Sequence, residues 1–454
     1  IQRELNNRSD EEKTLERLGF AYRKLNQTGL AIRSIEQAIE IARELKNRMD
    51  EANLLANLGL TYFLSGDYQG AIRCYDAELI IQRELKDRAG EANSLSWLGY
   101  SHDHLKLFAQ AISYHEQVLA IRRELKDSAQ EASALNSLAD DYAHAGQNEK
   151  ALGYYNQSLA IRHNLNDRSS ESATLTSMAG FYYDQHDYPQ ALNYYEQALQ
   201  IARALKNPER EASALWGIAS VQRDLAHYEK AIESFEQALV IRHTMKDTQE
   251  EIRVLNSLGM IQLNVGGYER AFSNFTKALD IARSSGNRTA EGLTLNTLGS
   301  VYFVLGQRQK AIAYFEQALA IAREVKNRTQ ECMALMTLGF ARQQLGEYAK
   351  SIEQLNEAKS ILVELKTRVL EPIVLAALGM AYDALNQSDK AIEYFQQALM
   401  LARELRTDSQ EAIALAGLAQ SYIKVRQYER ARVYCEQGLA IVRAQKSREG
   451  QAGL

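Results

Sequence analysis

The chain has 454 residues, a net charge of −5 at pH 7 and only three prolines. Because proline breaks helix interiors, this scarcity favours helix along nearly the whole chain. The mild charge offers no basic stripe for nucleic acid, and no apolar run approaches the ~18 residues that cross a membrane. We therefore expect neither nucleic acid nor a membrane as a partner.

The three cysteines, Cys74, Cys332 and Cys435, lie far apart and form no CxxC pair. The sequence therefore indicates neither a disulfide framework nor a zinc site, and we expect no metal and no cofactor. Free cysteines suit a reducing compartment, so we expect a cytoplasmic protein.

The first residues, Ile1 to Leu5, match Ile81 to Leu85, which end the second helix of a repeat described below. Residues 1–7 are therefore expected to be the tail of a preceding repeat. The last residues arrive where a further repeat would begin. Both ends look cut, and we expect either a piece of a longer protein or a protein with poorly ordered ends.

From residue 8 onwards, one pattern returns every 40 residues without a gap. Glutamate recurs from Glu11 to Glu411, and a leucine follows each glutamate four residues later, from Leu15 to Leu415. Eleven matches in register predict a single array over residues 1–454. Its repeats begin near residues 8, 48, 88, 128, 168, 208, 248, 288, 328, 368 and 408.

Each repeat contains two amphipathic stripes. In the first repeat, Leu15, Leu18 and Tyr22 share one helical face, and a second stripe begins at Ala31. The connection between stripes is two or three residues long, so the helices must fold back as an antiparallel hairpin. Most connections hold a residue that tolerates the left-handed conformation that ends helices, namely Asn26, Gly66, Gly146, Gly266, Gly306, Gly346 or Asn386.

The junctions between repeats carry helix-start signals. Asparagine, aspartate or threonine precedes each first helix, as at Asn7, Asn47, Asp87, Thr367 and Thr407, and these residue types cap helix N-termini. The repeating glutamate falls in the first turn, where its charge suits the helix dipole. We therefore interpret the glutamate row as structural.

Two further features concern packing. Rows of small residues, which include Gly19 and Ala31, mark places where the two helices approach closely, because a bulky side chain would force them apart. Pro372 falls several residues into a first helix, where it would remove a backbone hydrogen bond. This position predicts that the tenth first helix starts late, near Glu371, after a distorted linker.

The repeat pattern resembles the tetratricopeptide repeat family. The motif spans both helices, as in Leu295, Leu298, Gly299, Tyr302, Ala311, Phe315 and Ala318. The period of 40 is similar to the variety found in kinesin light chain, in LGN-like proteins and in bacterial regulatory arrays. The resemblance implies an all-α fold, an α-solenoid of about eleven antiparallel helix pairs in a right-handed superhelix. It also implies that first helices line a concave groove.

The family register places five side chains of each first helix in that groove, and these differ between repeats. Three zones follow. The first repeat is cationic, with Lys13, Arg17, Arg23 and Lys24. An acidic zone contains Asp103, Asp140, Asp184 and Asp224, beside His104 and His144. An apolar zone contains Met260, Leu263, Leu293, Phe303, Val304, Met333, Met336, Phe340, Ile373, Met380, Ile413 and Ile423.

The apolar zone predicts a binding surface, because contiguous exposed hydrocarbon marks interaction sites. From it we select Met260, Leu263, Phe303, Met336, Phe340, Met380 and Ile423 as contacts for an apolar extended segment or an amphipathic helix. The alternative is that several zone members, especially Leu293, Met333, Ile373 and Ile413, pack against neighbouring first helices.

The acidic zone could steer a basic peptide or could only keep the protein soluble. Asp140, His144 and His104 could in principle share a metal, but their spacing is a weak signal. Trp97 and Trp216 could anchor a partner or wedge between repeats.

The sequence holds no nucleotide-binding loop and no hydrolase motif, so we expect no enzymatic activity. The leading hypothesis is a scaffold that binds a peptide or protein segment in its groove. The alternative is a regulatory or sensor arm of a larger bacterial signalling or protease-like protein, whose groove engages another domain of the same chain. Self-association through the ends is a further possibility.

Overall fold

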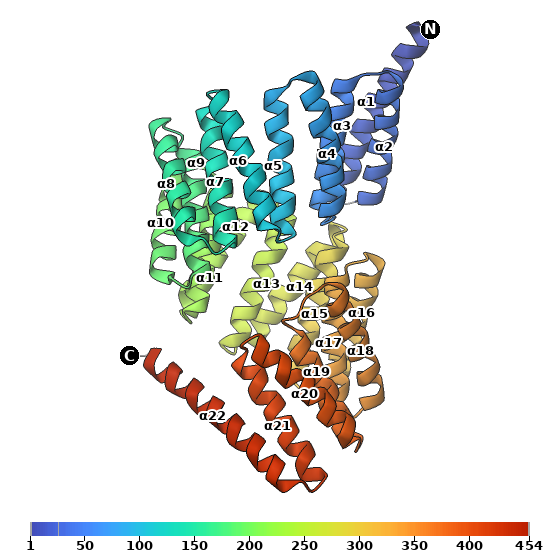
Figure 1. Ribbon diagram of the computed structural model, residues 1–454, viewed down its shortest axis with the longest axis vertical. Coiled ribbons are helices and arrows are strands. Elements are labelled where there is room, and N and C mark those ends of the chain that lie inside the picture. Colours follow the sequence, from blue (N-terminus) through green and yellow to red (C-terminus); the bar gives the residue numbers. More distant parts are fainter. Residues whose placement is uncertain (1, 26, 453–454) are drawn as a thin grey trace. The chain divides into compact units, whose positions relative to one another are not determined.

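The computed structural model describes residues 2–25 and 27–452, with side chains for 7–25 and 27–444. All secondary structure in these residues is helical. The chain divides into two compact units, Ile1–Asp247 and Thr248–Leu454. Figure 1 shows helices that are consecutive in the sequence running antiparallel as neighbours in each unit. No helix among the described residues is long and apolar enough to cross a membrane.

Unit 1 contains six hairpins, formed by α1 (Gln2–Lys24), α2 (Thr28–Glu44), α3 (Arg48–Leu64), α4 (Tyr68–Leu85), α5 (Arg88–His104), α6 (Phe108–Glu124), α7 (Ser128–His144), α8 (Asn148–Asn164), α9 (Arg168–Asp184), α10 (Tyr188–Ala204), α11 (Pro208–Asp224) and α12 (Tyr228–Thr244). Odd-numbered helices are the first helices of their repeats. Residues 2–7, expected as the tail of a preceding repeat, are continuous with α1.

Unit 2 contains five hairpins, formed by α13 (Thr248–Asn264), α14 (Tyr268–Ser284), α15 (Arg288–Val304), α16 (Arg308–Glu324), α17 (Arg328–Gln343), α18 (Tyr348–Glu364), α19 (Glu371–Ala384), α20 (Ser388–Glu404), α21 (Asp408–Lys424) and α22 (Tyr428–Ala452). The all-α solenoid of paired helices is confirmed. The late start of α19 at Glu371 is confirmed as well, with Pro372 in its first turn, where a missing N–H is tolerated.

The predicted capping residues act as expected at most junctions. The side chain of Asn47 accepts a hydrogen bond from the Asp50 N–H, and Asp87 accepts one from the Gly90 N–H. The prediction is wrong at Asn7, which lies inside α1, and at Thr407, whose side chain does not cap α21. It also fails at Thr367, because Pro372 moves the start of α19 three residues on, from the expected position 368 to Glu371.

The predicted stop residues take the left-handed conformation, from Gly66 with φ 84° to Asn386 with φ 59°. Asn26 lies outside the described residues. The close approach of the small-residue rows is also confirmed. A Cβ on Gly59 would lie 2.8 Å from the Tyr75 ring, and one on Gly299 would lie 2.5 Å from the Phe315 ring. These glycines let an aromatic side chain of the second helix pack flat against the first helix.

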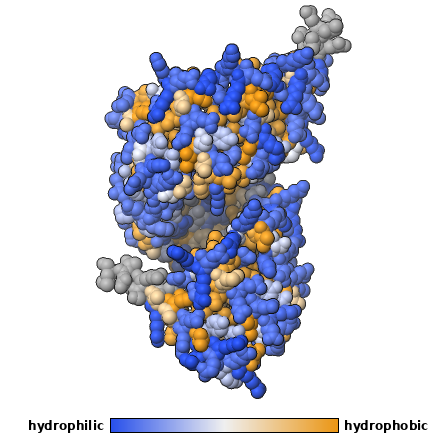
Figure 2. Space-filling model, viewed as in Figure 1, coloured by the Kyte–Doolittle hydropathy of each residue, from blue (hydrophilic) through white to orange (hydrophobic). Residues whose placement is uncertain are grey.

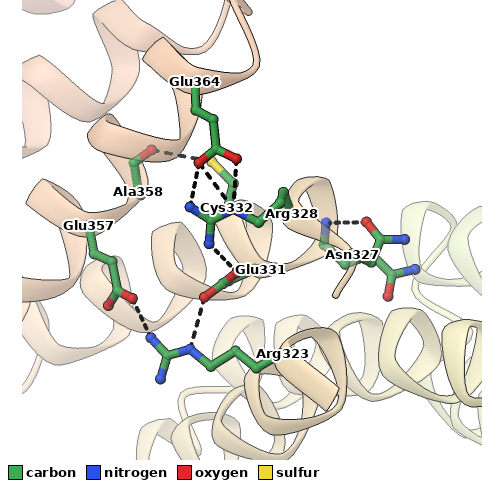
Figure 3. Close-up of polar contacts among 9 residues, drawn as sticks. Arg323, Asn327, Arg328, Glu331, Cys332, Glu357, Ala358 and Glu364 are labelled. Atoms are coloured by element: carbon green, nitrogen blue, oxygen red, sulfur yellow. Dashed lines mark hydrogen bonds and ion pairs between the residues drawn. The ribbon is translucent and has the colours of Figure 1, made fainter. Parts of the chain in front are cut away.

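The repeating glutamate is held by arginines, which the sequence interpretation missed. Glu331 is buried, with 5% of its surface exposed, and accepts bonds from Arg323 Nε at 2.9 Å and Arg328 Nη1 at 2.5 Å (Figure 3). Arg328 also contacts Glu364 at 2.5 Å, and Arg323 contacts Glu357. Side chains of α16, α17 and α18 therefore form one network around this carboxylate. Two arginines hold Glu51, Glu91 and Glu291 in the same way.

Substitution of Glu331 by Gln should destabilise unit 2 by about 1–3 kcal/mol, because two charged hydrogen bonds to a buried group are lost. Burial acts to raise the pKa of Glu331, but the bonds from Arg323 and Arg328 outweigh it and lower the pKa. A lowered pKa stabilises the fold above the ordinary value of 4.5, and this stabilisation disappears as the pH falls through the folded-state pKa.

Urea unfolding monitored by circular dichroism measures this effect. The control is Glu353→Gln, which removes the same charge from an exposed position on α18. Equal urea midpoints for the two variants at pH 7 would contradict a stabilising role for the buried glutamate.

Candidate functional site

Within each unit, first helices line one continuous surface. Successive first helices contact each other, as in α7 with α9, α15 with α17 and α19 with α21. Among the described residues, successive second helices meet through long side chains, such as Arg323 with Glu357, and their backbones do not approach as closely, so each unit is narrower on its first-helix side. We call this surface the first-helix face. On the side of the molecule drawn in Figure 2, apolar patches interrupt the polar surface of both units.

The first-helix face of unit 2 contains an apolar pocket of about 130 Å³ between α17, α19 and α21. We call it the apolar pocket. It joins two predicted contacts, Phe340 and Met380, and Met380 is 46% exposed. The remaining lining residues are Gln343, Pro372, Ile373, Ala376, Ala377, Gln410 and Ile413. Ile373 and Ile413, for which internal packing was the alternative, both line this pocket, and Ile373 also packs against a core cluster of α17, α18 and α19.

The prediction for Met336 is wrong, because this side chain is buried with only 7% of its surface exposed. Its flexible chain lies in a core cluster shared by α17, α18 and α19, together with the small Ala377. Small residues on α19 leave room that the methionine fills. A buried side chain cannot contact a partner on this face.

The other apolar candidates lie outside the apolar pocket. Met260 and Ile423 are exposed, at 47% and 44%. Leu263 and Phe303 are half-buried and pack against core clusters of unit 2. The structure therefore brings two of the seven selected contacts together in one pocket and leaves the exposed pair as separate surface positions.

The first-helix face of unit 1 contains a polar cavity of about 210 Å³, lined by Asp140, Ala143, His144, Tyr155, Ser177, Gly180, Phe181, Asp184 and Gln185. We call it the acidic cavity. It joins Asp140 and Asp184, two of the four predicted acidic residues. Asp103 instead bonds to His144 at 2.8 Å. Asp224 bonds to Arg223 at 2.7 Å and to the Tyr183 hydroxyl.

Asp140 has an unusual electrostatic environment. Burial raises the pKa of its carboxyl to about 6, against the lowering effect of a hydrogen bond from the Tyr155 hydroxyl. The oxygen atoms of Tyr155 and Asp140 lie 2.5 Å apart, and Asn136 donates a second bond at 3.0 Å. The hydrogen bond to Asp103 raises the pKa of His144. The cavity therefore contains a carboxylate with neutral donors only.

The structure does not assemble the suggested metal site. His144 is engaged by Asp103, and His104 stacks on Tyr68 with ring centroids 4.7 Å apart. In the part of the chain that the structure describes, no group of three metal-ligating side chains comes together. Trp97 stacks on Tyr75 with ring centroids 5.8 Å apart, so it acts as a wedge between repeats.

The cationic zone lies on α1. Arg17 and Arg23 line a hollow with Glu16, Phe20, Ile35 and Asn57, and Arg23 and Lys24 lie over the Phe20 ring. Arg17 and Arg23 therefore share this hollow with the carboxylate of Glu16, and the lining is mixed in charge.

A buried histidine–aspartate hydrogen bond between repeats three and four escaped the sequence analysis. His115 is 1% exposed, and its Nδ1 lies 2.6 Å from Asp141 Oδ2. Burial raises the pKa of Asp141, although the bond to His115 opposes the shift. In the other repeats, the position equivalent to His115 holds an aromatic or aliphatic residue or one cysteine, and the position equivalent to Asp141 holds no ionisable residue. A histidine and an aspartate at positions where the other repeats hold neither were therefore the signal in the sequence that could have revealed this contact.

Comparison with known proteins agrees with the geometry. The tetratricopeptide repeat family model matches residues 10–84, 90–163, 170–242, 250–324 and 330–404. The chain belongs to the tetratricopeptide repeat family. No curated protein matches the sequence.

Solved structures resemble this tetratricopeptide array at low identity. The apo form of the quorum sensor NprR from B. thuringiensis is 14% identical, covering 80% of this chain and 99% of that one, with a TM-score of 0.51. The apo form of RapI is 15% identical over 61% and 99%, with a TM-score of 0.50. TPR-like repeats of a P. anserina kinesin light chain are 20% identical over 43% and 96%, with a TM-score of 0.39.

Substitution of His115 by Phe should destabilise the tetratricopeptide array by about 3 kcal/mol, because it leaves the Asp141 charge buried without its partner. The double variant His115→Phe/Asp141→Val reproduces the Phe275 and Val301 combination of two later, successive repeats, and should recover most of the loss. Urea midpoints measure both. A double variant as unstable as the single one would contradict a stabilising role for the His115–Asp141 hydrogen bond.

Proposed function

We propose that the chain is a non-enzymatic interaction scaffold that binds an apolar peptide segment on the first-helix face of unit 2. The observation that carries the proposal is the apolar pocket, in which Phe340, Ile373, Met380 and Ile413 from three successive first helices surround about 130 Å³. Exposed hydrocarbon of this kind is costly in water unless a partner covers it.

The surroundings of the pocket favour a ligand whose side toward the pocket carries no charge. Its polar lining comes from the amides Gln343 and Gln410. On α19 and α21, the charges of Asp383 and Lys424 are paired with each other, with Nζ and Oδ2 2.8 Å apart. A segment with two or three apolar side chains on one side therefore fits best, and methionine lets the surface adapt to it.

Free cysteines at Cys74 and Cys332, both buried, support a reducing compartment such as the cytoplasm as the place where the scaffold works. The segment could come from a separate protein or from another domain of the same polypeptide, and the two sources share this chemistry.

Phage-displayed 12-residue peptides selected on the chain should be enriched in apolar residues at alternating or helical spacing. Met380→Glu should weaken a selected peptide at least ~10-fold, the scale of an interface hot spot, because it places a charge in the pocket. Anisotropy of a fluorescent peptide measures the affinity.

The matched control is Met400→Glu, the same change at a 68% exposed position on the second helix α20. It should leave the affinity unchanged. Equal loss in both variants, or peptides without apolar residues, would contradict the proposed site.

A further inference from the structure

The acidic cavity of unit 1 exists because one side chain is missing. The fifth residue after each repeating leucine points to the first-helix face. At this position Gly180 is the one glycine in the sequence. The other repeats have Phe20, Leu60, Tyr100, Asp140, Ser220, Met260, Ser300, Phe340, Met380 and Gln420. A Cβ on Gly180 would meet only the Tyr195 hydroxyl, at 3.8 Å. Packing therefore does not require the glycine, in contrast to Gly59 and Gly299.

The cavity walls combine charge with aromatic surface. Asp140 of α7 and Asp184 of α9 supply carboxylates, and Tyr155 and Phe181 supply rings. Asp184 is exposed, whereas Asp140 is partly buried. Carboxylates beside aromatic faces are the surroundings that a guanidinium or an ammonium group prefers, through charged hydrogen bonds and cation–π attraction.

Asp140 is the second observation that points to a ligand. Its bonds come from the Tyr155 hydroxyl and the Asn136 amide, both of which are neutral. The nearby imidazole of His144 is directed to Asp103. Burial raises the pKa of this partly buried carboxyl. Among the described residues, His144 and Arg162 act on it through space and the printed hydrogen bonds to it are neutral, so a positive group from outside can add a charged hydrogen bond there.

We propose that the acidic cavity binds one cationic side chain, an arginine guanidinium, from a protein segment on the first-helix face of unit 1. The proposal rests on the scaffold function only in taking a peptide as ligand. It concerns a different unit from the apolar pocket, so either site can fail while the other stands.

The probe is the pentapeptide Gly-Ser-Arg-Ser-Gly, titrated into the full chain by calorimetry at pH 7.5. In matched peptides the arginine is replaced by citrulline, which keeps the shape but has no charge, or by lysine, which keeps the charge but lacks the paired N–H donors of the guanidinium. The arginine peptide should bind at least ~10-fold more tightly than the citrulline peptide. Lysine should bind between the two, because it is a point charge without bidentate geometry.

Two variants locate the binding. Gly180→Met fills the cavity with the residue that Met260 and Met380 carry in the same row, without a change in charge, and should abolish binding. Asp184→Asn should weaken binding several-fold, whereas Glu196→Gln, an equal charge change at an exposed position on α10, should not. Circular dichroism checks that each variant stays helical.

The affinity should fall as the pH drops through about 6, where Asp140 takes up its proton. The titratable and charged groups around it are Asp141 and His144 on α7, Tyr100 and Asp103 on α5, Tyr155 and Arg162 on α8 and Asp184 on α9. Protonation of His144 adds positive charge and acts in the same direction.

Equal binding of the arginine and citrulline peptides would overturn the proposal. Unchanged arginine binding by Gly180→Met would also overturn it, because the attraction would then come from the general charge of the surface. Absence of arginine binding at millimolar concentration would do the same.

Discussion

No hairpin of this protein can bury its own apolar stripes, and this constraint governs the array. Most second helices bury an aromatic residue against the first helix, which carries a glycine at the point of approach, as for Tyr75 and Phe315, or an alanine, as for Phe235. The outer surfaces of a hairpin are then covered by the next one. Positions that serve this stacking must repeat every 40 residues, which leaves variation to the first-helix face.

A second contact, an arginine–glutamate ion pair at the edge of the hairpins, also recurs with the 40-residue repeat. The arginine that holds the buried glutamate also reaches a glutamate 36 residues later, as in Arg328 with Glu364. Both partners occur together in six repeats, from Arg8 with Glu44 to Arg368 with Glu404. Both are absent in four, where the arginine position reads Ser128, Pro208, Thr248 or Asp408. Only Arg168 stands without its glutamate. Because a lone surface charge contributes little, the pair is kept or lost as a unit.

The sequence was sufficient to predict what the stacking constraint repeats. The helix pairs, the left-handed stop residues and the late start of α19 all follow from local rules on glycine, asparagine and proline. It could not predict contacts that depend on side-chain direction. Met336 occupies a repeat position that was expected to face the groove, but its side chain is buried beside Ala377. Asp103 belongs to the predicted acidic zone, but its carboxylate is hydrogen-bonded to His144.

In the candidate sites too, the sequence identified some residues, but not the contacts between helices that form the sites. The sequence identified Phe340 and Met380 as exposed apolar residues, but the apolar pocket also needs Ile373 and Ile413 from neighbouring helices. The acidic cavity depends on Gly180, a residue that contributes no chemistry of its own and was not singled out. Function on this scaffold therefore arises where a variable position departs from its row, by adding hydrocarbon in unit 2 and by omitting a side chain in unit 1.

The central claim is that ligands bind to first helices and not to second helices. Hydrogen–deuterium exchange with a bound, phage-selected peptide tests it most directly. The account predicts slower exchange in α17, α19 and α21, with α18 and α20 unchanged. Protection concentrated on α18 and α20 would contradict the account, because it would place the ligand on the opposite surface of the same repeats.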